Sequence, residues 1–139
     1  MNLDKLIPRK INFDKSISNH HNLLNDNISD SNVLVIGGAG TIGSSYIKQL
    51  LNYKPSKITV VDINENGLTE LTRDLRSSSL LDYNPAYITY PVNLLSDTFM
   101  KIFYSETWQV VANFSATVSC VMTNILEFGK SILYKGILV

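Results

Sequence analysis

Short apolar runs rich in β-branched residues alternate along this chain with stretches whose apolar residues fall three or four positions apart. The short runs cover residues 32–36, 58–62, 86–90 and 109–114 and predict four β-strands. The longer stretches cover residues 41–53, 65–78 and 95–106 and predict three amphipathic helices. The second run is apolar enough for burial on both faces, which is typical of parallel strands. The alternation therefore predicts an α/β fold with a parallel sheet of about four strands, flanking helices and right-handed crossovers.

Neither end of the chain shows this pattern clearly. Residues 1–31 are polar and asparagine-rich without a sustained period, and we expect a loosely ordered leader on the domain surface. Residues 117–139 contain many apolar positions but are interrupted by Gly129 and Gly136, and part of this segment fits a helix over 120–133. The expected organisation is a polar leader (1–31), one folded unit (32–116) and a divergent tail (117–139).

Composition and charge fit an ordinary globular protein of 139 residues, of which 45% are apolar. The 12 Lys and Arg balance the 12 Asp and Glu, which disfavours a dedicated nucleic-acid binder. No apolar run approaches the ~20 residues that cross a bilayer, and the first residues lack the core of a signal peptide. We therefore expect a cytoplasmic protein. We expect no metal site, because the single Cys120 and the adjacent His20 and His21 lack other ligands nearby in the sequence.

Three spaced glycines follow the first predicted strand and lead into the first predicted helix. Gly37 lets the chain reverse at the strand end, Gly40 leaves room for a pyrophosphate, and Gly43 lets the helix pack closely on the strand. The unpaired N–H groups and the dipole at the helix start favour a phosphate there. Strand, glycine turn and helix in this order predict a dinucleotide-binding, Rossmann-like unit.

An acidic residue, Asp62, ends the second predicted strand. It follows Gly43 by close to the ~20 positions expected of a carboxylate that binds the adenosine ribose. Such a carboxylate accepts hydrogen bonds from the ribose hydroxyls and repels a 2′-phosphate, so NAD is slightly favoured over NADP. The alternative is that Asp62 is only a strand-end or capping residue, and Asn64 can cap the second helix.

The run Gly37-Gly-Ala-Gly-Thr-Ile-Gly43 has one glycine more than the simple dehydrogenase pattern and resembles the extended short-chain dehydrogenase/reductase superfamily. Residues 48–76 combine a Lys-Pro-Ser-Lys loop, a strand that ends in Asp, and a Glu-Leu-Thr-Arg-Asp-Leu-Arg helix. This combination resembles the polysaccharide-biosynthesis branch, which contains nucleotide-sugar 4,6-dehydratases and epimerases such as the UDP-N-acetylglucosamine 4,6-dehydratases. The resemblance covers residues 33–116 and implies the NAD(P)-binding N-terminal part of such an enzyme.

The resemblance also places two later segments at the cofactor. Asn93 stands where the branch usually has an Asp near the adenine, and its amide could still bind a base edge, although a turn asparagine is an equal alternative. Residues 113–116 match a run of small residues beside the nicotinamide ribose. The candidate cofactor-binding residues are Gly37, Gly38, Ala39, Gly40, Thr41, Ile42, Gly43, Asp62, Ile63, Asn64, Asn93, Leu94, Ser115 and Ala116.

After Ala116 the resemblance ends, and the family's Lys-His-Val-like segment, its Tyr-x-x-x-Lys pair and its sugar-nucleotide domain do not follow. Tyr53 and Lys57 match the spacing of that pair, but they precede the second strand, at the sheet end opposite the expected cofactor. We therefore predict no catalytic residue and a truncated cofactor-binding domain. An internal deletion and a frameshift near residue 116 explain the tail equally well.

Three functions follow from these observations. By resemblance the chain is the cofactor-binding part of a nucleotide-sugar dehydratase or epimerase, which lacks catalysis by itself and binds a nucleotide sugar only in a complete family member. It could instead be a non-catalytic dinucleotide-binding module or an inactive fragment. A sheet that stops after four strands exposes the edge of the fourth, which predicts self-association or coverage by the tail.

Overall fold

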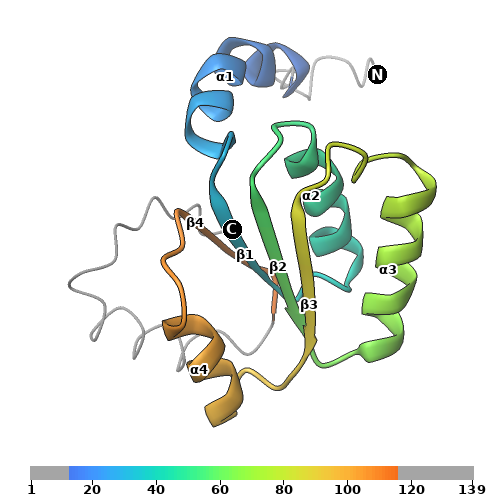
Figure 1. Cartoon of the computed structure of the whole chain (residues 1–139). Helices are drawn as coiled ribbons and strands as arrows, with labels where there is room; N and C mark the ends of the chain where they lie inside the picture. The colour runs from blue at the N-terminus through green and yellow to red at the C-terminus, as the bar shows by residue number, and fades with distance from the viewer. Residues whose placement is uncertain (1–12, 116–139) are drawn as a thin grey trace, which may run out of the picture.

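The computed structural model describes residues 13–115, which form one parallel sheet with helices on both faces (Figure 1). The strands lie in the order β3-β2-β1-β4 and are β1 (Asn32–Ile36), β2 (Lys57–Asp62), β3 (Ala86–Pro91) and β4 (Val110–Asn113). Helices α2 (Thr41–Leu51) and α3 (Glu65–Ser77) cover one face, and α4 (Asp97–Tyr104) covers the other. The Rossmann-like fold predicted from the alternation is confirmed.

Two hydrophobic clusters bury the two faces of the sheet. Alternate residues of β1 enter different clusters, since Val33 and Val35 belong to the α2–α3 side while Leu34 and Ile36 belong to the α4 side. All four side chains are at most 1% exposed. This explains why the strand reads as a continuous apolar run rather than an alternating one.

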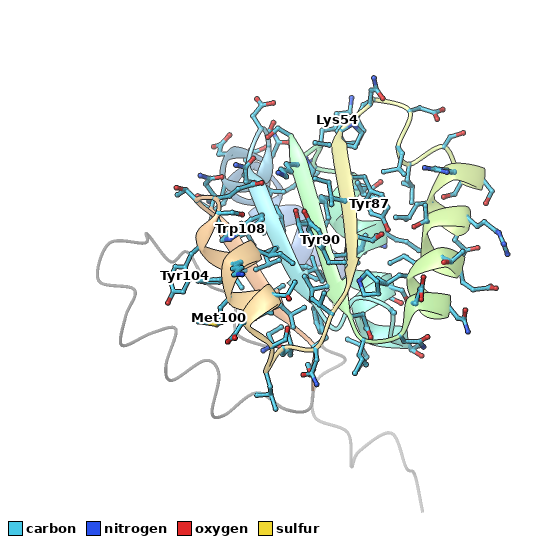
Figure 2. All side chains as sticks on the ribbon, turned by 60° about the horizontal axis from the view of Figure 1, so that its bottom comes forward. Lys54, Tyr87, Tyr90, Met100, Tyr104 and Trp108 are labelled. Atoms are coloured by element: carbon cyan, nitrogen blue, oxygen red, sulfur yellow. The ribbon has the colours of Figure 1, made fainter. Side chains whose placement is uncertain are left out.

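Trp108 closes the α4 side of the sheet, where Met100 and Tyr104 also lie (Figure 2). Its side chain is 2% exposed, and its indole N–H donates to the carbonyl oxygen of Phe103 at 2.8 Å. Both polar and apolar parts of the ring are therefore used in packing between α4 and β4.

The segment before β1 contains a helix, α1 (Phe13–Ile28), so the expectation of a loosely ordered leader is wrong there. Ile28 is 7% exposed in the α2–α3 cluster, and Leu24, one helical turn earlier, packs against the same cluster. The asparagines around them hid this spacing in the sequence. The helix lies beyond the amino ends of the strands (Figure 1).

The predicted helix ends differ from the observed ones by a few residues. The third predicted helix begins later than expected, because Ser96 caps α4 by accepting a hydrogen bond from the N–H of Phe99 at 3.2 Å. The predicted cap of α3 is confirmed, since Asn64 accepts from the N–H of Gly67 at 3.0 Å. Within residues 13–115, no helix has both the length and the apolar character needed to span a bilayer.

Candidate cofactor site

A cavity of about 390 Å³ opens at the carboxyl ends of the strands. The strand order changes direction at β1, because β2 and β3 lie on one side of it and β4 on the other. Such a switch point leaves a crevice in which open α/β sheets bind ligands. The cavity is lined by the glycine loop and the residues that follow β2, β3 and β4: Gly37, Gly40, Val61, Asp62, Ile63, Val92, Asn93, Leu94, Leu95, Phe114 and Ser115.

Backbone crowding fixes the glycine loop between β1 and α2. Gly37 has a φ of +73°, and a Cβ added there would lie 2.8 Å from the backbone nitrogen of Ser115. A Cβ added at Gly43 would lie 2.4 Å from the carbonyl oxygen of Gly37. Gly43 thus permits a close approach as predicted, but to the loop's own backbone rather than to the strand. Gly38 is also enclosed, since its added Cβ would lie 2.3 Å from Cγ1 of Val60.

The start of α2 is open by contrast. Gly40 is the N-cap residue, and among the atoms of the described residues a Cβ added there would meet only the carbonyl oxygen of Gly37, at 3.7 Å. Within residues 13–115 no side chain caps α2, and its first turn holds no acidic residue, whereas α3 and α4 are capped by Asn64 and Ser96. The N–H groups and positive dipole end of α2 therefore suit an anion beside the cavity.

The carboxylate of Asp62, at the end of β2, accepts hydrogen bonds from the backbone of two segments: the glycine loop and the turn that follows β2. Its Oδ2 accepts from the N–H of Ala39 at 2.9 Å, and its Oδ1 accepts from the N–H of Asn64 at 2.9 Å. Each carboxylate oxygen has a second acceptor position, so these bonds leave capacity for ribose hydroxyls. The strand-end interpretation of Asp62 and its ribose interpretation are therefore compatible.

Apolar side chains extend the cavity beyond Asp62. Ile63 is 72% exposed and Leu95 is 65% exposed although both line the cavity. Asn93 also lines the cavity, and its Oδ1 accepts from the N–H of Leu95 at 2.9 Å. Asn93 is thus a turn asparagine that also lines the cavity, and its contact with an adenine stays a prediction.

The end of β4 forms the remaining wall. The Oδ1 of Asn113, whose side chain is buried, accepts from the N–H of Ser115 at 2.8 Å. The ring of Phe114 lies 5.0 Å from that of Tyr46 on α2, measured between centroids. Burial raises the pKa of the Tyr46 phenol above its ordinary value.

Seven of the sequence-predicted cofactor residues line the cavity: Gly37, Gly40, Asp62, Ile63, Asn93, Leu94 and Ser115. Six others do not line it: Gly38, Ala39 and Asn64 in the turns that follow β1 and β2, and Thr41, Ile42 and Gly43 in the first turn of α2. Ala116 lies outside the described residues. Sequence reasoning missed Val61, Val92, Leu95 and Phe114. Val61, Val92 and Phe114 lie at or just after the carboxyl ends of predicted strands, a position that could have revealed them, whereas Leu95 begins the third predicted helix.

The Tyr-x-x-x-Lys sequence lies at the other end of the sheet, as predicted. Lys57 is the first residue of β2 and forms an ion pair with Glu106, while Tyr53 packs beside the ring of His21. Lys54, which directly follows Tyr53 in the sequence, is labelled at this end of the sheet in Figure 2. Among the residues that the structure describes, no group of three or more His, Cys, Asp or Glu is arranged to hold a metal ion.

Residues 33–126 match the family described as Polysaccharide biosynthesis protein. The chain belongs to this family. The match confirms the resemblance to the polysaccharide-biosynthesis branch of the short-chain dehydrogenases/reductases. An uncharacterized membrane protein of Methanocaldococcus jannaschii, MJ1061, is 45% identical over 51 residues, which make up 37% of this chain and 15% of that protein.

Solved structures are similar to this chain. Pen from Bacillus thuringiensis has a TM-score of 0.52 and 25% identity, over 72% of this chain and 30% of its own. The enzyme WbmF from Bordetella bronchiseptica, solved in complex with NADH, has a TM-score of 0.44 and 22% identity, over 63% of this chain and 23% of its own. The chain therefore matches less than a third of the length of each of these proteins.

Proposed function

We propose that this chain binds a nicotinamide dinucleotide at the cavity beside the glycine loop. The observation that carries the proposal is the start of α2, where Gly40 leaves open space and no side chain of the described residues accepts from the N–H groups. A pyrophosphate there would meet a helix dipole and unpaired donors. Asp62 would accept hydrogen bonds from the adenosine ribose, and the exposed side chains of Ile63 and Leu95 would cover the flat faces of the base.

We further propose that this unit, residues 32–116, is the cofactor-binding part of a cytoplasmic nucleotide-sugar dehydratase or epimerase. When bound, the dinucleotide supplies a hydride acceptor for the sugar. The described residues of this chain hold and orient its adenosine half, through the glycine loop, Asp62 and Asn93. We assign these described residues a role in binding and none in proton transfer.

Calorimetric titration of the full chain tests the proposed site. We expect weak binding of NAD, and a dissociation constant for NADP roughly tenfold higher, since the Asp62 carboxylate repels a 2′-phosphate. In the Asp62→Ala variant the difference between the two cofactors should shrink to about twofold or less. No heat with NAD, together with a thermal midpoint that NAD leaves unchanged in both proteins, would remove the proposal.

Turnover of UDP-N-acetylglucosamine tests the catalytic part of the proposal. We expect no keto-sugar product from this chain with NAD, because the cavity has no acid–base pair beside it among the described residues. The matched control is the same assay on a complete family member. Formation of the keto-sugar product by this chain would show that the chain contains catalytic residues, and would contradict the prediction that it has none.

We also propose self-association through β4, which ends the sheet within residues 13–115. An edge strand with the apolar sequence Val-Val-Ala-Asn presents unpaired backbone groups that a second copy can use. Sedimentation velocity over a hundredfold range of concentration should show a rising fraction of dimer. A single monomeric species over the whole range would contradict this, and would fit an edge covered by residues 117–139.

A further inference from the structure

The Asp62 carboxylate, at the end of β2, connects the glycine loop with the turn that leads into α3. Its bond to the N–H of Ala39 holds the middle of the glycine loop, and its bond to the N–H of Asn64 holds the turn after β2. The side chain of Asn64 continues the series by capping α3 at Gly67. A single series of hydrogen bonds therefore runs from the glycine loop to the first turn of α3.

The loop and α3 are also in close contact at this point. A Cβ added at Gly67 would lie 2.9 Å from the Cβ of Ala39, so the two segments leave no room between them. Ala39 itself packs against the α2–α3 cluster. Because a hydrogen bond to an ionised acceptor is roughly twice as strong as a neutral one, the carboxylate is a firm anchor for Ala39.

We propose that Asp62 is a positioning residue that fixes the glycine loop before a ligand arrives, in addition to any contact with a ribose. The inference rests on the proposed function and deepens it. A loop held in its binding geometry avoids the entropy cost of becoming ordered around the pyrophosphate. Asp62 should therefore contribute to the affinity for phosphate-bearing ligands that lack the ribose hydroxyls.

Two ligands separate the positioning role from a ribose contact. ADP carries both ribose hydroxyls, and 2′,3′-dideoxy-ADP carries neither. We expect Asp62→Asn to weaken the binding of both by about tenfold, because an amide presents only one acceptor oxygen where two N–H groups need one each. A loss confined to ADP, with unchanged affinity for dideoxy-ADP, would overturn the proposal.

The matched control is Glu65→Gln, which removes the same charge from an exposed carboxylate three positions along the chain. We expect it to change neither affinity by more than about twofold. A loss of equal size in Glu65→Gln would assign the effect to net charge and overturn the positioning role. If Asp62→Asn does not fold, Asp62→Ser, whose hydroxyl can accept one of the two bonds, takes its place.

Amide hydrogen exchange in the ligand-free chain gives a readout that does not depend on binding. We expect exchange at Ala39 to be about tenfold faster in Asp62→Asn than in the wild type, and unchanged in Glu65→Gln. Equal exchange at Ala39 in all three proteins would overturn the proposal. If the wild-type chain binds neither ADP nor NAD, the proposed function fails, while the exchange rates still decide the positioning role.

Discussion

Replacing Gly43 with alanine should lower the free energy of unfolding by about 3 kcal/mol, the upper part of the range for overpacking. The added Cβ would lie 2.4 Å from the carbonyl oxygen of Gly37 and 2.8 Å from the Cα of Gly38. Both are backbone atoms, and Gly37 is held in turn by its N–H bond to the carbonyl of Val61 at 2.8 Å. The helix propensity of alanine favours the variant by only about 1 kcal/mol, so the clash decides the sign.

Urea denaturation followed by the fluorescence of Trp108, the single tryptophan, measures this effect. The matched control is Gly40→Ala, at the N-cap of α2 three positions earlier. Its Cβ would have one neighbour, at 3.7 Å, and its φ of −74° suits any residue, so we expect a change within about 0.5 kcal/mol. If Gly43→Ala were as stable as Gly40→Ala, the backbone around Gly43 would have room for a Cβ, which would contradict the short distances in the structure.

Replacing Gly40 with aspartate should separate stability from binding. An aspartate at the N-cap accepts a hydrogen bond from the first turn of α2, so the free energy of unfolding should stay equal or rise by a few tenths of a kcal/mol. The same carboxylate would occupy the place proposed for the pyrophosphate and repel it. We expect the affinity for NAD to fall at least 100-fold, which corresponds to about 2.7 kcal/mol.

Gly40→Asn is the control for charge in this experiment, because asparagine caps helices as well as aspartate does but carries no charge. We expect it to lose less affinity than Gly40→Asp, and the difference between the two variants should shrink at high salt. Calorimetry at two salt concentrations and urea denaturation measure the two effects. An aspartate variant that binds NAD like the wild type would place the anion somewhere other than the start of α2.

Features that depend on neighbours in sequence could be predicted. The strand–turn–helix order around Gly37, the cap at Asn64 and the position of Asp62 at a strand end all follow from periodicity and spacing. The family resemblance follows from the same local runs, and the match over residues 33–126 confirms it.

Features that depend on distant contacts could not be predicted. Helix α1 packs through Leu24 and Ile28, yet its other residues give no clear period, so only the contact with the α2–α3 cluster reveals its apolar side. Leu95, the first residue of a predicted helix, lines the cavity because the segment after β3 meets the glycine loop in space.

By itself the sequence determined the alternation of strands and helices, the open glycine turn and the acid that follows it, because each is set by residues close together in the chain. Only the tertiary structure decided which atoms these residues meet. It placed the backbone of Gly37 against Gly43, and it joined Asp62 to Ala39 across 23 positions of sequence. The physical reason is that parallel strands bring their carboxyl ends together at one edge of the sheet, whatever their separation along the chain.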